Sequence, residues 1–188
     1  MRLFLALELP SEVRSTVAAA VEALPLDRRD WRRTREEALH LTLRFLGEVD
    51  ERTRAAVEPA ARAAAAGVPP LPLRVGGFGG FPEKGRPRVA WVGIEDLSQG
   101  GALARLGEAL EQAARESGLP PEPRPFRPHV TVARAREGAR PAPVPAGAPG
   151  PLALFVATQV TLFRSDLKPG GPTYTAVGAY PLSGRAPA

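Results

Sequence analysis

The chain has 188 residues, no cysteine and a formal net charge of +5, with 25 basic against 20 acidic residues. A chain of this length can bury a core without covalent staples, and the lack of cysteine excludes disulfides, thiolate catalysis and cysteine-ligated metal centres. Because no apolar run reaches the roughly 18 residues of a membrane span, we expect a cytoplasmic protein. The basic excess permits a phosphate-bearing partner, although an arginine-rich codon bias would produce it too.

Hydrophobic periodicity, and the prolines and glycines between periodic segments, predict the regular elements. Apolar residues three or four positions apart indicate a helix, and apolar residues at alternate positions indicate a strand. In chain order we predict a strand at 2–9, a helix at 10–24, a strand at 40–47, a helix at 51–66, a hairpin of strands at 71–81 and 88–94, a helix at 101–117, and strands at 129–134, 152–163 and 173–182.

Three further segments are predicted to lack regular structure. The basic segment 27–37 reads as a solvated loop, with contact to a phosphate backbone as the alternative. The Pro/Ala/Gly-rich segment 136–151 predicts an exposed loop, and residues 184–188 predict a frayed tail.

Two stretches share one order of elements and end in the same motif. A strand from Leu3, a helix and His40 form the first, and a strand from Val89, a helix and His129 form the second. This repetition predicts a duplicated α+β fold that brings the two motifs together across a central cleft. Chance recurrence of a common strand–helix–strand unit is the alternative. We expect one domain, 1–188, with pseudo-repeat halves of roughly 1–86 and 87–183.

The two histidines of the chain, His40 and His129, each begin a His-x-Thr-x motif, HLTL (40–43) and HVTV (129–132). Residues i and i+2 of a strand share a face, so each motif presents one imidazole and one hydroxyl. Two imidazoles facing one cleft form an acid–base pair near neutral pH, and hydroxyls can hold a phosphate. In-line attack on a phosphodiester needs this set of groups, without a metal or a covalent intermediate.

The motifs allow two other interpretations. A histidine on a strand commonly serves packing alone. Two histidines with carboxylates can also hold zinc or iron, but neither motif contains Asp or Glu, so no metal and no other cofactor is expected. The chain also lacks a GxxxxGK[ST] loop, which argues against ATP-driven chemistry.

The motifs resemble those of the 2H phosphoesterases, and nearly the whole chain resembles the RNA 2′,3′-cyclic phosphodiesterases, also called 2′-5′ RNA ligases. Similarity extends to RLFLALELP (2–10), FGGFPEKGRPRVAWVGI (78–94) and SDLKPGGPTYTAVGAYPL (165–182), whereas 140–151 looks specific to this chain. The resemblance implies a bilobal fold of two antiparallel sheets flanked by helices around a central cleft that carries both motifs.

The resemblance also implies an activity and roles. The activity is metal-independent hydrolysis of RNA 2′,3′-cyclic phosphodiester ends to 2′-phosphomonoesters, with reverse 2′-5′ RNA joining. His40 would be the proton donor, His129 the proton acceptor, and Thr42 and Thr131 would bind phosphate. The expected partners are RNA ends or nucleotide cyclic phosphates, and we expect a monomer that does not bind membranes.

For the arginines and the aromatic residues, the sequence leaves more than one position or role open. Strand parity puts Arg44 on the face of His40 and Arg134 on the face opposite His129, yet the resemblance favours Arg134 in the form HxTxxR. A strand ending or a bulge near Ala133 would re-aim Arg134, so both arginines are predicted to bind substrate, with Arg134 favoured over Arg44. Aromatic side chains that could stack bases or pack in the core are Trp31, Phe78, Phe81 and Trp91.

Two functions remain as alternatives to RNA-end hydrolysis. The first is a 2H phosphoesterase for small cyclic nucleotides, ADP-ribose phosphates or 2′-5′ oligonucleotides, because the motifs recognise only the phosphodiester. The second is a non-catalytic protein that binds RNA ends.

Overall fold

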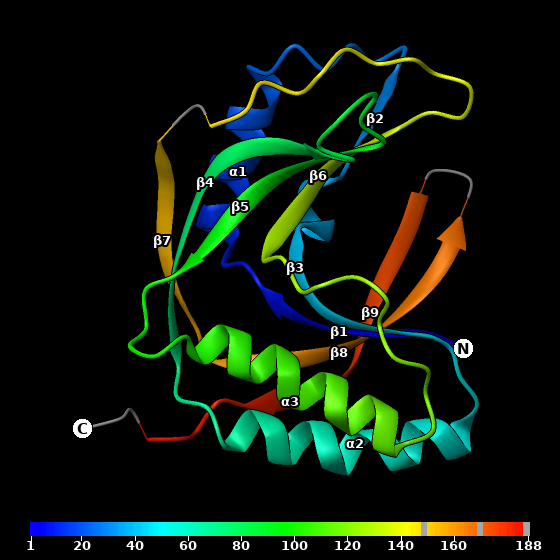
Figure 1. Ribbon diagram of the computed structural model, residues 1–188, viewed down its shortest axis with the longest axis vertical. Coiled ribbons are helices and arrows are strands. Elements are labelled where there is room, and N and C mark those ends of the chain that lie inside the picture. The colour runs from blue at the N-terminus through cyan, green and yellow to red at the C-terminus, as the bar shows by residue number, and fades with distance from the viewer. Residues whose placement is uncertain (148–149, 169–170, 186–188) are drawn as a thin grey trace.

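Strands and helices alternate along the computed structural model, which describes residues 1–147, 150–168 and 171–185 (Figure 1). The strands are β1 Arg2–Glu8, β2 Trp31–Arg33, β3 His40–Glu48, β4 Leu71–Phe81, β5 Val89–Asp96, β6 His129–Ala135, β7 Pro151–Ala157, β8 Gln159–Lys168 and β9 Gly171–Pro181. The helices are α1 Ser11–Glu22, α2 Glu51–Ala66, α3 Ala102–Glu116 and a short 3-10 helix, Glu36–Ala38.

Most predicted elements are found near their predicted bounds, with two differences. The single strand predicted at 152–163 is two strands, β7 and β8, that separate at Thr158. The chain crosses there from pairing with β4 to pairing with β9, which a continuous apolar pattern does not reveal. The segment 27–37, predicted as a loop, contains β2, which is too short to produce a periodic signal.

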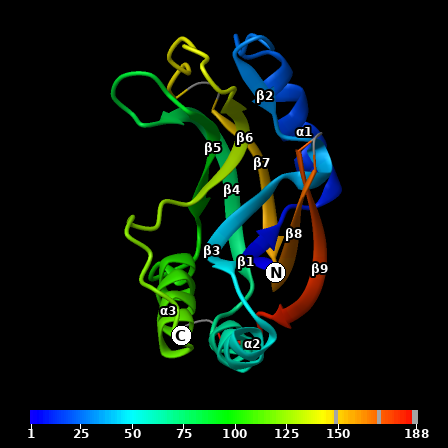
Figure 2. The same ribbon diagram turned by 90° about the vertical axis from the view of Figure 1, so that its right-hand side faces the viewer.

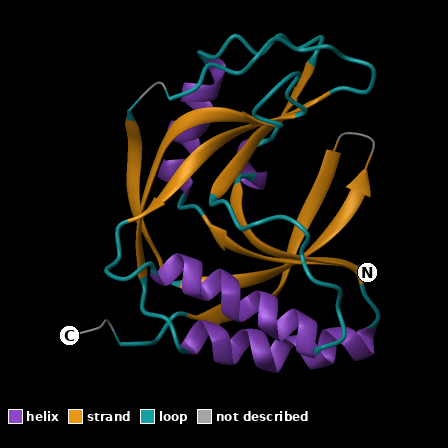
Figure 3. Cartoon of the chain, in the orientation of Figure 1, coloured by secondary structure: helices purple, strands orange, loops and turns teal. Residues whose placement is uncertain are grey.

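The strands, orange in Figure 3, are all antiparallel to their neighbours. They pair in the order β7-β4-β5-β6-β3-β1-β8-β9, with β2 also paired to β6. The predicted α+β class with antiparallel pairing is confirmed. The expectation of two separate sheets needs one correction, because the halves are continuous through a single register pair, Leu41 with Val130. The reason is that β3 reaches only the beginning of the free edge of β6, and β2 occupies its end.

The two halves of the sheet draw on different parts of the sequence. The half with β3 combines both ends of the chain, because β8 and β9 lie beside β1, whereas β4, β5, β6 and β7 make up most of the other half. The predicted repeat boundaries, 1–86 and 87–183, remain a prediction about the origin of the chain.

Helices cover the sheet from opposite ends of the molecule. α2 and α3 pack side by side, α2 against β9 and α3 against β3, whereas α1 packs against β7 at the other end (Figures 1 and 2). Their buried apolar residues join those of the strands in one core cluster. Burying each large aliphatic side chain contributes about 1.5–3 kcal/mol, so this layer holds the central strands in place.

The predicted loop and tail are more firmly attached than expected. The described part of 136–151 has no helix and strand only at Pro151, but Val144 packs in the core with 9% of its surface exposed. In the tail, the Gly184 N–H donates to the Val68 carbonyl at 2.9 Å. Residues 148–149 and 186–188 of these two segments lie outside the described residues. Over the part of the chain that is described, no helix is both long and apolar enough to cross a membrane.

Candidate active site

The central strands β3 and β6 bring the two histidine motifs together. Antiparallel pairing of Leu41 with Val130 places His40 across from Thr131 and Thr42 across from His129. Leu41 and Val130 are fully buried, so the four polar side chains share the opposite face, where each is partly exposed. We call the sheet face that carries His40, Thr42, His129 and Thr131 the motif face.

Both histidines are held by the same local contact. His40 Nδ1 lies 2.8 Å from the Ala38 carbonyl oxygen, and His129 Nδ1 lies 2.6 Å from that of Arg127. Because a carbonyl oxygen only accepts hydrogen bonds, Nδ1 carries the proton in each ring and Nε2 is left to react. The Nε2 atom of His40 is also 3.0 Å from the Thr42 hydroxyl. Both rings are therefore held in the same tautomer, and the His40 Nε2 in addition lies beside the hydroxyl of its own motif.

The surroundings disfavour the charged form of both rings. Burial, together with the nearby positive charges of Arg134 and His129, lowers the pKa of His40 to about 4, although the hydrogen bond to the Ala38 carbonyl acts in the opposite direction. Burial also lowers the pKa of His129, again assisted by Arg134. At neutral pH both rings are therefore neutral in the unliganded protein. A ring that donates a proton in catalysis needs a negative charge beside it to raise its pKa.

We expect both histidines to titrate below pH 6.5 in the unliganded protein and at higher pH when inorganic phosphate is bound. A bound anion stabilises the imidazolium, so each pKa should rise on binding. NMR titration of the ring signals measures this directly, and a His40→Gln variant assigns the two signals. A His40 pKa at or above 6.5 without phosphate would contradict the expected burial of this ring.

Aromatic rings supply the burial around each histidine. The His40 ring lies 4.8 Å from that of Phe4 and 5.1 Å from that of Tyr174, measured between centroids. The His129 ring lies 5.1 Å from Phe81 and 6.3 Å from Trp91. Each imidazole thus has apolar surface on one side and the open motif face on the other.

The predicted aromatic residues divide into two pairs. Trp31 and Phe78 are each only 2% exposed and belong to the core, whereas Phe81 and Trp91 lie beside His129. The rings beside His40 were not predicted. Phe4 and Tyr174 come from β1 and β9, and only the register of the sheet brings them to β3.

A β-bulge in β3 decides where Arg44 points. Thr42 and Arg44 oppose consecutive residues of β1, which leaves Leu43 as the extra residue. A bulge of this kind turns two successive side chains to one side and reverses the alternation after them. Leu43 and Arg44 are accordingly both buried, and Phe45 turns outward. The prediction that Arg44 shares the face of His40 is therefore wrong.

Arg44 instead ties β3 to α3 and to the segment that follows it. Its side chain is 7% exposed; its Nε lies 2.5 Å from Glu111 Oε2 and its Nη1 lies 3.9 Å from Glu122 Oε2. Nη2 also donates to the Pro120 carbonyl at 2.5 Å. These internal partners give Arg44 a structural role.

A matching bulge in β6 aims Arg134 at the motif face. Thr131 and Ala133 oppose consecutive residues of β5, which leaves Val132 as the extra residue. Val132 and Ala133 are both buried, and Arg134 turns to the side of His129 with an exposed side chain. The two bulges occupy equivalent positions after the two motifs.

Positive charge predominates around the two rings. Arg134 lowers the pKa of both rings and Arg124 lowers that of His129, while the pKa of His40 is lowered by His129 and raised by Glu8. Among the described residues, no three His, Cys, Asp or Glu side chains gather in a way that could hold a metal ion. The hydroxyls and guanidiniums of the motif face suit an anion such as a phosphate.

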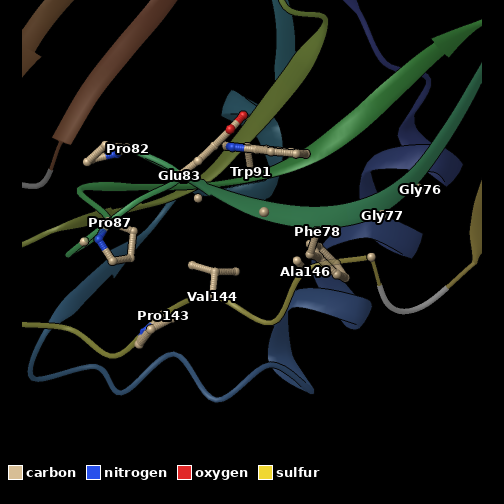
Figure 4. A pocket seen from close by; sticks show the side chains of 14 residues that line it. Gly76, Gly77, Phe78, Pro82, Glu83, Pro87, Trp91, Pro143, Val144 and Ala146 are labelled. Carbon is tan, nitrogen blue, oxygen red and sulfur yellow. The ribbon is translucent and has the colours of Figure 1, made fainter.

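Next to this site is a cavity of about 480 Å³, whose lining residues are drawn in Figure 4. The glycine-rich end of β4 and residues 143–147 line it, together with Trp91, whose ring is near His129. None of the four motif residues lines this cavity.

The sequence of this chain is similar to a known family and to proteins with an assigned activity. A family model described as the 2′-5′ RNA ligase superfamily matches residues 10–169, a span that includes both motifs and both bulges. An RNA 2′,3′-cyclic phosphodiesterase of Thermus thermophilus is 38% identical and covers 98% of this chain and 91% of its own. One of Geobacillus stearothermophilus is 32% identical over 96% of this chain, which spans 57% of that protein's length.

Solved structures show the same arrangement. A protein of Thermus thermophilus superposes with a TM-score of 0.82 at 35% identity, covering 98% of this chain and 99% of its own. Escherichia coli LigT in complex with 3′-AMP superposes with a TM-score of 0.76 at 29% identity, covering 97% and 98%.

Proposed function

This chain belongs to the 2′-5′ RNA ligase superfamily, and from that premise we propose that it hydrolyses the 2′,3′-cyclic phosphodiester at RNA ends to a 2′-phosphomonoester. The observation that carries the proposal is the pair of imidazoles on one sheet face, each with Nδ1 bonded to a backbone carbonyl and Nε2 left to react. Thr42, Thr131 and Arg134 lie on the same face. This combination supports acid–base attack on a bound phosphodiester.

In the proposed reaction His129 Nε2 takes a proton from water as the water oxygen bonds to phosphorus. The bond from phosphorus to the 3′ oxygen breaks, and His40 gives that oxygen a proton. The threonine hydroxyls donate to the non-bridging oxygens, and Arg134 neutralises their charge. A 5′-hydroxyl of RNA in place of water would form a 2′-5′ linkage from the same cyclic phosphate.

Because its pKa is lowered in the free protein, His40 needs the bound substrate in order to become protonated. The phosphate must raise the pKa of His40 before the ring can act as the acid. No proton transfer in this scheme needs a metal or a covalent intermediate, because each His Nε2 exchanges its proton directly with a reacting oxygen.

The decisive experiment is turnover of a short RNA with a 2′,3′-cyclic phosphate end, in EDTA, from about pH 4 to about pH 9. We expect 2′-phosphate ends and a bell-shaped profile whose two limbs belong to the histidine pair. Because both free-protein pKa values are lowered, kcat/KM should be highest below about pH 6.5. The kcat optimum should lie at higher pH, since bound substrate raises the pKa of the acid.

Other outcomes of the same assay would change the proposal. Cleavage of a mononucleotide 2′,3′-cyclic phosphate alone would keep the chemistry and change the substrate. Tight RNA binding without turnover of either substrate would leave a protein that only binds RNA ends. Loss of activity in EDTA, restored by a divalent metal, would contradict the metal-independent reaction. That the protein acts as a cytoplasmic monomer is also part of the proposal.

A further inference from the structure

β2 places a second arginine directly beside Arg134. The register of β2 on β6 pairs Arg32 with Arg134, between Trp31 paired with Ala135 and Arg33 paired with Ala133. Directly paired residues of neighbouring strands have Cα atoms about 4.5–5.5 Å apart and point to one face. Trp31 is buried on the other side, and both Arg32 and Arg134 are exposed. Two guanidinium groups therefore lie next to each other on the motif face.

The other arginines of segment 27–37 have carboxylate partners. Arg29 contacts Asp27 at 3.1 Å, Arg35 contacts Glu37 at 3.3 Å, and both Arg28 and Arg33 pair with Glu22. Within the described residues, neither Arg32 nor Arg134 has a salt bridge or a side-chain hydrogen bond. Like charges directly opposite one another destabilise a sheet, so this pair is arranged against the stability of the fold.

More positive charge surrounds the pair. The Arg134 side chain keeps exposed surface, but its partial burial lowers its pKa; the charges of Arg32, Arg2 and Arg124 act in the same direction, and the ionised form of Tyr174 would act against them. Arg134, Arg2, Arg32 and Arg35 also lie near Tyr174, whose pKa burial raises. One cyclic phosphate carries a single negative charge, which Arg134 alone can neutralise. The cluster has the charge and the donors for a second phosphate.

The strand order places Arg134 and Arg32 at different distances from the reacting group, so the two arginines can bind two different phosphates. Arg134 follows His129 and Thr131 on β6, so it is next to the reacting group. β2 takes over the edge of β6 where β3 leaves it, so Arg32 lies one strand away, beyond the end of the two motifs. Neighbouring strands are about 4.8 Å apart, a spacing that lets long side chains reach successive groups of one extended backbone.

We propose that Arg32 binds the phosphodiester that precedes the terminal cyclic nucleotide, and that the site therefore selects RNA ends of two or more nucleotides over mononucleotide cyclic phosphates. The inference rests on the proposed function and narrows its substrate class. Its basis is that Arg32 and Arg134 are neighbours on the motif face and that, within the described residues, neither has a carboxylate partner.

The test compares kcat/KM for a dinucleotide that ends in a 2′,3′-cyclic phosphate with kcat/KM for the matching mononucleotide. We expect the wild-type ratio to exceed about ten and to fall about tenfold in Arg32→Gln, as for loss of one charged phosphate contact. The salt dependence for the dinucleotide should become shallower by about 0.7 in log–log slope, the value for one phosphate of a single strand.

Arg29→Gln is the matched control, because it removes the same charge from the same segment at an exposed, carboxylate-paired position. Its substrate ratio should equal that of the wild type. The Tm of Arg32→Gln should be unchanged or raised, since a like-charge contact is removed. An unaltered ratio in Arg32→Gln, or a wild type without preference, would overturn the inference alone. Turnover of neither substrate by the wild type would instead overturn the proposed function.

Discussion

Replacing either histidine with alanine should reduce kcat/KM for a cyclic-phosphate RNA by about 10²–10⁴-fold, the contribution of one general acid or base. Each ring serves one side of the reaction, and the chain has no third histidine to replace it. The two groups act in one step, so a His40→Ala/His129→Ala double variant should be little slower than either single variant. Steady-state turnover of the same RNA substrate measures all three variants.

Controls must separate lost chemistry from lost structure. His40→Gln keeps an amide that can hydrogen-bond to Thr42 but cannot titrate, and we expect it to be as inactive as His40→Ala. Phosphate binding by these variants should persist, because the threonines and Arg134 remain. A single histidine variant that retains near wild-type turnover would refute the two-histidine mechanism.

The second large effect concerns stability. Arg44→Ala should lower the free energy of unfolding by about 3–5 kcal/mol, because removing one member of a buried ion pair leaves the other without a counter-charge. Glu111 and Glu122 would remain, each 28% exposed. Their partial exposure keeps the expected loss toward the lower end of that range. Chemical denaturation measures the change, and the KM for a cyclic-phosphate substrate should stay close to that of the wild type.

Arg134→Ala should leave the stability nearly unchanged and raise KM, the opposite of what we expect for Arg44→Ala. The exposed Arg134 side chain contributes little to stability, while losing a charged contact to phosphate costs about 1.5–3 kcal/mol and should raise KM about tenfold or more.

Arg54→Ala is the control for Arg44→Ala, because it removes an arginine from an ion pair at a more exposed place. Arg54 pairs with Glu58 at 2.6 Å along α2, and such pairs contribute only about 0.2–0.5 kcal/mol. A stable Arg44→Ala protein with a raised KM would reverse our placement of Arg44 and Arg134.

The parts of the site that the sequence predicts are those that depend on local alternation. His40 and Thr42 must share a face if the segment is a strand, and so must His129 and Thr131. The apolar residues between them specify which face is buried. The meeting of the motifs was also foreseeable, because the repeated order of strand and helix implies two related units.

Side-chain directions beyond the motifs depend on partner strands. Alternation predicts that Arg44 points with His40, and the bulge at Leu43 reverses this. In a bulge, one strand has one residue more than the strand that it pairs with, so the sequence of neither strand alone reveals it. The bulge at Val132 was anticipated only as a way to re-aim Arg134.

The sequence by itself determined the α+β class, most of the element bounds and the two imidazole–hydroxyl pairs, since these follow from composition and from periods of 2 and 3.6 residues. Only the tertiary structure decided which rings bury His40, where Arg44 and Arg134 point, and that Arg32 stands beside Arg134. The reason is that each of these depends on register between strands distant in sequence. The lowered pKa of His40 depends on them in turn, because burial comes from β1 and β9 and charge from β6.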